Sequence, residues 1–225
     1  MFKFSLFILL LFTSGIIPIF SKDCSTIVQP NLQKDCYERK YKIADKDLNK
    51  TYKRIYSSLN KVKKKEIKEN SISWIKYKDY QCDYQKEMSS SKTSGEIAYF
   101  SCLLDQTLTR TKFLKSVYNS SLTDKVEGQY WDIYGGTLDI KKKGEAHELK
   151  INVVRGPTFH LGEISGIVEF KKEKFTAQLG EEDNDPCFLT IETSVKIIDI
   201  KEGKGCNLYH GAKAYFDGKY FKVKD

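Results

Sequence analysis

The hydrophobic positions of this chain follow two different periods, and the period changes near residues 123–128. Before that point, apolar side chains recur at steps of three and four, which is typical of amphipathic helices. The clearest such stripe consists of Ile43, Ala44, Leu48, Tyr52, Ile55, Leu59 and Val62. After that point the period is two, which is typical of strands. The pattern predicts a two-domain α+β protein, with a helical domain over residues 22–122 and a β domain over residues 126–225.

Three helices are predicted in the first domain. The first begins near Asn31, whose side chain is a candidate N-cap, and follows the stripe described above. The second covers about residues 64–86, with Ile75 among its inner positions. The third covers about residues 96–118, after a loop rich in serine at residues 89–95. Because short loops join the three helices, we expect them to pack as an antiparallel three-helix bundle.

Seven or eight short strands are predicted in the second domain, with glycine residues at the turns. This spacing is typical of an antiparallel meander that closes into a small barrel or a sandwich. A core filled by side chains is favoured over a barrel that holds a small apolar ligand, because so few strands enclose little space. The expected strands cover residues 128–134, 137–140, 147–154, 162–170, 174–179, 187–192, 195–200 and 212–220.

The first 21 residues have the composition of a signal peptide (residues 1–21). Lys3 precedes an apolar segment at residues 4–17, Pro18 breaks the segment, and cleavage is expected after Ser21. A membrane-spanning helix and a lipid anchor on Cys24 are the alternatives. The apolar segment is short for a span, and the residues before Cys24 are not small and neutral. We therefore expect an exported protein, periplasmic or secreted.

Six cysteine residues, an even number, fit this destination, because disulfides form in oxidising compartments. Pairing within each domain leaves three possible sets of bridges. The preferred set joins the cysteine residues that the expected helices and strands bring side by side. It pairs Cys24 with Cys36, Cys82 with Cys102, and Cys187 with Cys206.

The helical half also carries recognisable short runs around its four cysteine residues. They include the segment from Cys24 to Cys36, a Trp-x-x-Tyr-Lys-Asp-x-x-Cys run at residues 74–82, and a run at residues 101–114. Together they resemble the N-terminal domain of the LprI-type lysozyme inhibitors, a helical module of exported bacterial proteins. The resemblance implies an extracytoplasmic role in inhibiting lysozyme. It carries no binding residues to this chain and leaves the β domain unassigned.

Charge is unevenly distributed along the chain. The formal net charge is +8, with +9 on residues 22–125 and −2 on residues 126–225. The densest basic run could bind anionic lipid or wall polymer, or it could be a solvated loop between helices. Nucleic acid is not expected as a partner outside the cell, and no aromatic residues interleave the run. The run consists of Lys61, Lys63, Lys64 and Lys65.

The densest acidic run lies just before Cys187 in the β domain. Three interpretations remain open: a solvated turn, a calcium site without the spaced ligands of a dedicated loop, and a contact surface for a basic partner. Animal-type lysozymes are basic, and an acidic rim speeds association with such a partner. The run therefore marks the predicted partner-binding residues, which are Glu181, Glu182, Asp183 and Asp185.

Catalysis is not predicted from this sequence. His147, His160 and His210 are isolated from one another along the chain, and each cysteine residue has an expected partner. The sequence contains no Cys-x-x-Cys pair that would indicate a metal site and no glycine-rich loop that would indicate a bound phosphate. No cofactor or metal site is therefore expected.

Asp79 and Arg110 are a candidate ion pair between the second and third helices.

The sequence thus predicts an exported protein that binds a partner at the cell envelope. The preferred partner is a lysozyme or another wall-degrading enzyme. The alternative is an interaction module that binds anionic lipid or wall polymer through the basic helical domain.

Overall fold

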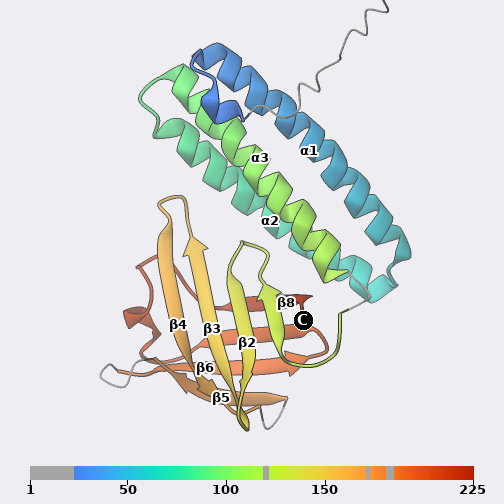
Figure 1. Cartoon of the computed structure of the whole chain (residues 1–225), viewed down its shortest axis with the longest axis vertical. Coiled ribbons are helices and arrows are strands. Elements are labelled where there is room, and N and C mark those ends of the chain that lie inside the picture. The colour runs from blue at the N-terminus through green and yellow to red at the C-terminus, as the bar shows by residue number, and fades with distance from the viewer. Residues whose placement is uncertain (1–22, 119–121, 171–172, 181–184) are drawn as a thin grey trace, which may run out of the picture.

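The computed structural model describes residues 23–118, 122–170, 173–180 and 185–225 (Figure 1). The predicted signal peptide lies outside the described residues. Helices occupy the first part of the chain and strands the second, which confirms the α+β fold class. The helical elements of the first part are η2 (Cys24–Thr26), α1 (Pro30–Ser58), α2 (Lys61–Glu87) and α3 (Lys92–Val117), and a short helix η3 (Cys206–Leu208) lies between the last two strands.

The helix starts differ from the predicted ones. Gln29 precedes α1 without a side-chain cap and Pro30 occupies the first turn, so Asn31 lies inside the helix and the predicted cap is wrong. Proline suits this position because its missing N–H would have no partner there. The α3 helix begins at Lys92, within the predicted loop, because Ser91 and Ser94 form a reciprocal capping box.

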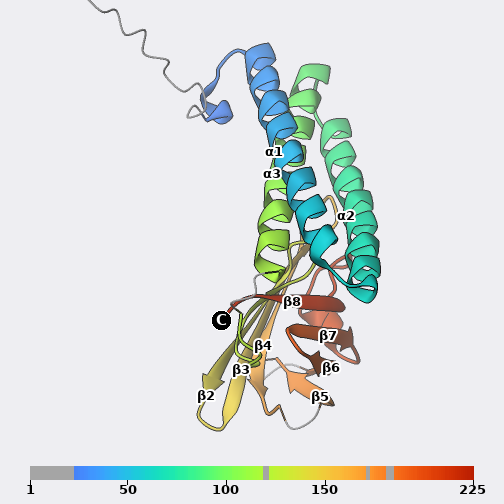
Figure 2. The ribbon, with the colours of Figure 1, turned by 90° about the vertical axis from the view of Figure 1, so that its right-hand side faces the viewer.

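The helix α3 is the central member of the bundle. It packs against both α1 and α2, and Figure 1 shows it lying between them. The three long helices are antiparallel to their neighbours along the chain, and Figure 2 shows the bundle on one side of the β domain, next to β8. The buried apolar side chains of the bundle include Leu48, Ile55, Ile67, Trp74, Phe113 and Leu114.

The β domain is an eight-stranded antiparallel sheet in the order β4-β3-β2-β1-β8-β7-β6-β5. It consists of two meanders, β1 to β4 and β5 to β8, which β1 and β8 join. The strands are β1 (Gly128–Trp131), β2 (Thr137–Lys143), β3 (Ala146–Arg155), β4 (His160–Val168), β5 (Lys174–Leu179), β6 (Cys187–Ser194), β7 (Ile197–Glu202) and β8 (Gly218–Lys224).

The predicted last strand, residues 212–220, was placed too early. Ala214 and Phe216 are buried at alternate positions, which imitates a strand, but they belong to an irregular segment before β8. Burial of every second residue shows that one side of the chain faces the core. An irregular segment that covers the core can have the same pattern as a strand.

The sheet curls into a nearly closed barrel. At the seam between β4 and β5, the Gly180 N–H donates to the Ser165 carbonyl oxygen at 3.1 Å. A side chain at Gly166 would meet Leu179 at 2.7 Å, so glycine permits this close approach. The interior is filled by apolar side chains that include Leu138, Leu149, Ile151, Leu189, Ile191, Ile200, Phe216 and Tyr220.

One apolar cluster continues from the bundle into the β domain. The rings of Phe113 in α3 and Phe221 in β8 meet edge to face, with centroids 5.7 Å apart. Trp131, Ile133 and Ile197 of the β domain pack against the same cluster. The two domains therefore share buried apolar surface.

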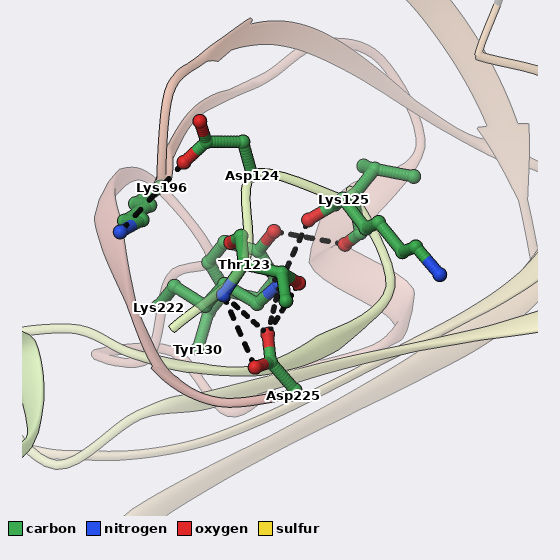
Figure 3. Close-up of polar contacts among 8 residues, drawn as sticks. Thr123, Asp124, Lys125, Tyr130, Lys196, Lys222 and Asp225 are labelled. Atoms are coloured by element: carbon green, nitrogen blue, oxygen red, sulfur yellow. Dashed lines mark hydrogen bonds and ion pairs between the residues drawn. The ribbon is translucent and has the colours of Figure 1, made fainter. Parts of the chain in front are cut away.

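A polar network secures the connection between the domains (Figure 3). The buried Lys222 ammonium donates to the carbonyl oxygens of Thr123 at 3.2 Å and Lys125 at 2.8 Å. It also pairs with the Asp225 carboxylate at 2.8 Å, which accepts from the Thr123 backbone N–H. Lys196 pairs with Asp124 at 3.7 Å on the same connection.

Candidate functional site

The three preferred disulfides are present in the structure. Their sulfur atoms join Cys24 to Cys36, Cys82 to Cys102, and Cys187 to Cys206. The first ties η2 to α1, the second joins the α2–α3 hairpin, and the third joins β6 to the short helix η3 (Cys206–Leu208). The second bridge involves α2, which carries the predicted basic residues, and the third lies just after the predicted acidic run.

The predicted acidic surface is only partly described. Glu181, Glu182 and Asp183 lie outside the described residues. Asp185 lies two residues before Cys187, and its carbonyl oxygen accepts a hydrogen bond from the Tyr209 hydroxyl at 3.2 Å. The Cys187–Cys206 bridge therefore fixes the C-terminal end of the acidic run.

The lysine run forms the first turns of α2, which Asn60 caps by accepting from the Lys63 backbone N–H at 2.9 Å. Two of its ammonium groups face carboxylates: Lys63 pairs with Glu66 at 2.8 Å, and Lys65 reaches Glu69 at 3.9 Å. These helical pairs reduce the positive potential that the run presents to an anionic surface.

Lys61 and Lys64 line a shallow hollow beside the ring of Tyr56, together with Lys65 and Lys68. The Lys64 ammonium lies 5.3 Å from the centroid of that ring. The hollow is the part of the run that best suits an anionic group.

A deeper cleft lies in the helical domain. Its volume is about 400 Å³, and it opens between α1 and α2 with α3 as its floor. Most of the surface that lines it is apolar or aromatic. The lining residues include Leu48, Tyr52, Trp74, Ile75, Arg110 and Leu114. We call this space the interhelical cleft.

Ile75 illustrates how the cleft departs from the predicted bundle. The sequence pattern places Ile75 on the inner side of the second helix, yet its side chain is 45 % exposed. The two outer helices diverge around α3, so the space that a tighter bundle would fill stays open.

Arg110 is the charged group of the cleft floor. It is 3 % exposed, and its guanidinium carbon lies 5.4 Å from the Trp74 ring centroid and 4.9 Å from that of Phe113. Its Nη2 donates to the Ser71 hydroxyl at 3.2 Å, whereas Nη1 has no acceptor among the described residues. Aromatic faces and one hydroxyl thus hold the guanidinium.

The expected ion pair between Asp79 and Arg110 is wrong. The Asp79 carboxylate contacts Lys78 at 2.5 Å on the exposed side of α2. Within the described part of the chain, no carboxylate lies at ion-pair distance from Arg110. Burial lowers the pKa of Arg110 from 12.5 to about 10, because desolvation disfavours its charged form.

Sequence reasoning missed Arg110 as a site residue, although a signal exists. Thr107, Arg110 and Leu114 are spaced by three and four positions, so the arginine lies on the buried stripe of α3. A cation on such a stripe requires a partner, and the sequence alone does not show whether one faces it.

Other chemistry has little support in the described residues. No group of three or more metal-ligating side chains occurs among them. His147 contacts Glu127 at 3.3 Å and His210 contacts Glu202 at 3.4 Å, as separate pairs. Within the described part of the chain, none of the helices has both the length and the apolar character needed to span a bilayer.

The helical domain is similar to known proteins. Residues 24–114 match the family model described as "Lysozyme inhibitor LprI", which confirms the resemblance of this region. The chain is also 26 % identical over 122 residues to "Uncharacterized protein YecT" of Escherichia coli (strain K12), covering 48 % of this chain and 75 % of that protein. No solved structure matches the chain.

Proposed function

We propose that this protein, whose helical domain is of the LprI type, inhibits a lysozyme outside the cytoplasm. The observation that carries the proposal is the match of residues 24–114 to a family of lysozyme inhibitors. The four cysteine residues inside the match form two disulfides.

Export is the second part of the proposal. The apolar segment over residues 4–17 behind Lys3 has the pattern of a signal peptide. Three disulfides join all six cysteine residues, and such bridges persist in oxidising compartments. Both features support a periplasmic or secreted protein.

The acidic run is the proposed contact surface for a basic lysozyme. The helical domain carries +9 and would be repelled by a basic partner, whereas the acidic run would attract it. The Cys187–Cys206 bridge and the Tyr209 hydrogen bond anchor Asp185 at the base of the run. Because Asp185 is held in place, less conformational entropy is lost when the acidic run binds its partner.

The test uses the whole mature chain, because the two domains share a core that separation would expose. A basic animal-type lysozyme lyses a cell-wall suspension with and without the purified protein, and turbidity reports the rate. Neutralising Glu181, Glu182, Asp183 and Asp185 together is expected to weaken inhibition by at least about tenfold at low salt.

A charge-matched control separates the contact from net charge. It neutralises four exposed acids elsewhere, namely Glu69, Asp83, Glu87 and Glu145. The control should inhibit like the unaltered protein. Equal weakening by both quadruple variants would remove the acidic run from the proposal, and full lysis with the unaltered protein would remove the inhibition itself.

The second candidate function is binding to anionic lipid or wall polymer through the lysine run. The observation that favours it is the hollow lined by Lys61, Lys64, Lys65 and Lys68. Binding to vesicles that contain phosphatidylglycerol should fade steeply with ionic strength and be lost on neutralising Lys61, Lys63, Lys64 and Lys65. Salt-independent binding, or none, would exclude this candidate.

A further inference from the structure

The interhelical cleft has the features of a ligand site that neither function uses. Its volume of about 400 Å³ falls within the usual range of small-molecule pockets. Most of its lining surface is apolar or aromatic, polar side chains lie among the lining residues, and one buried cation stands in its floor. Small-molecule sites commonly combine an apolar lining with a few polar groups that fix orientation.

The buried cation lacks the anion that such a group requires. Arg110 is 3 % exposed, and its Nη1 has no acceptor among the described residues. Burying a charge without a counterion is costly, and buried arginine residues are normally paired. A carboxylate in the cleft would supply the negative charge that the guanidinium lacks among the described residues.

The surroundings favour a single negative charge over a phosphate. Arg110 is one positive charge, and its nearest polar neighbour is the neutral hydroxyl of Ser71. Among the other lining residues, Lys78 is paired with Asp79, Lys68 is exposed to solvent, and Asp45 adds a negative charge that would oppose a dianion. One guanidinium matches the planar shape and charge of one carboxylate.

The apolar walls determine the rest of the ligand. Leu48 and Tyr52 of α1 face Trp74 and Ile75 of α2 across the floor formed by Leu114. Besides Arg110, the charged lining residues are Asp45, Lys68 and Lys78, and the Lys78 ammonium is paired with Asp79. An unbranched hydrocarbon chain would cover the apolar walls and displace water from apolar surface.

We propose that the interhelical cleft binds an amphipathic monocarboxylate of the fatty-acid class, with its carboxylate on Arg110 and its chain between α1 and α2. The proposal is independent of lysozyme inhibition. It gives the helical domain a binding activity of its own.

Titration calorimetry of the whole mature chain with sodium decanoate, below its micelle concentration, tests this proposal. Decanoate is expected to bind one per chain and at least about tenfold more tightly than decanol, which lacks the charge. Decyltrimethylammonium, which reverses the charge, should bind more weakly still. From octanoate to decanoate, each added methylene should tighten binding about threefold to fourfold.

Two variants locate the binding. Arg110→Gln should weaken decanoate by at least about tenfold and leave decanol unchanged. Ile72→Glu places a negative charge on the cleft wall at a side chain that is 46 % exposed, so it should fold normally and also weaken decanoate. Lys76→Gln, an exposed position of α2 outside the cleft, is the matched control for lost positive charge.

The outcomes are decisive in both directions. The proposal is supported if folded Arg110→Gln and Ile72→Glu selectively lose affinity for decanoate while Lys76→Gln keeps the affinity of the unaltered protein. Should Arg110→Gln fail to fold by circular dichroism, Ile72→Glu decides alone. Equal binding of decanoate and decanol, unchanged affinity in the folded variants, or no binding of decanoate would overturn it.

Discussion

Buried cations in this chain differ in what surrounds them. Lys222 is 1 % exposed but meets two carbonyl oxygens and the Asp225 carboxylate. Arg155 is equally buried and pairs with Asp132. Arg110 has aromatic rings and one hydroxyl instead. The paired cations act as structural elements, whereas the unpaired one marks a binding site.

Replacing Lys222 by methionine should destabilise the protein. The change keeps most of the side-chain volume but leaves the Thr123 and Lys125 carbonyl oxygens without their donor. We expect the free energy of unfolding to fall by about 2–4 kcal/mol, measured by urea denaturation. Lys224→Met, at an exposed position of the same strand, is the control and should change stability by less than about 0.5 kcal/mol. Equal effects of the two variants would contradict the structural role of Lys222.

The Asp225 contact predicts a pH dependence. Hydrogen bonds from Lys222 and from Thr123 lower the pKa of the Asp225 carboxyl from 3.8 to about 2. Because the folded-state pKa is lowered, the contact stabilises the fold fully above pH 3.8 and loses this effect as the pH falls through about 2. Carbon-13 NMR of the carboxyl group should show a midpoint near the lower value, moving back up in Lys222→Met. A midpoint at the ordinary value in the unaltered protein would show that the contact is absent.

Contacts between individual residues were easiest to predict from the sequence where the two residues lie close together along the chain. Cys82 and Cys102 were paired correctly because an antiparallel hairpin brings them together. Asp79 and Arg110 were paired wrongly because helical periodicity gives the face of each residue but not the direction in which a long side chain extends. The Lys222 network was missed because it joins segments about a hundred positions apart.

At the scale of elements, hydrophobic period predicted the helices and most strands. The element boundaries that were predicted wrongly are those that a feature other than the hydrophobic period determines. Pro30 starts α1, the Ser91–Ser94 capping box starts α3 early, and a buried irregular segment precedes β8. The divergence of α1 and α2 around α3 was also invisible, because periodicity does not specify how closely two helices approach.

The disulfide between α2 and α3 should contribute substantially to the free energy of unfolding. Cys82 is fully buried, and the bridge closes a loop of 20 positions. Replacing Cys82 and Cys102 by alanine should lower the free energy of unfolding by about 3 kcal/mol or more, because the unfolded chain gains freedom and the core loses contacts. Urea denaturation followed by circular dichroism measures the change.

The bridge between Cys24 and Cys36 is the comparison for this prediction. It holds the three-residue helix η2 against the start of α1, so its removal should leave the helical content nearly unchanged. A loss below about 1 kcal/mol on removing the α2–α3 bridge would contradict the stabilising role given to it.

At the scale of the whole molecule, the helical and β domains share one apolar cluster. Phe113 and Phe221 meet edge to face, and the same cluster includes Trp131 and Ile197. The sequence predicted both domains but not their contact, because the residues of the interface read as ordinary core positions of each domain. Their shared burial appears only when the two parts are docked.

Unfolding experiments should reveal this coupling. The unaltered chain is expected to unfold in one transition, with Trp fluorescence and circular dichroism coinciding. Phe221→Ala should cost about 3–5 kcal/mol and separate the two signals, since it opens the interface. Leu161→Ala, at a side chain that is 67 % exposed, should leave one transition. Two separate transitions in the unaltered protein would show that the domains are independent.

Inhibition of lysozyme by the intact mature chain is the most direct test of the proposed function. The protein is titrated into a fixed amount of basic lysozyme acting on cell walls, and the lysis rate is followed by turbidity. We expect the rate to fall with increasing protein and to be restored when bound protein is removed. An unchanged lysis rate at a large molar excess of folded, disulfide-bonded protein would contradict the proposal.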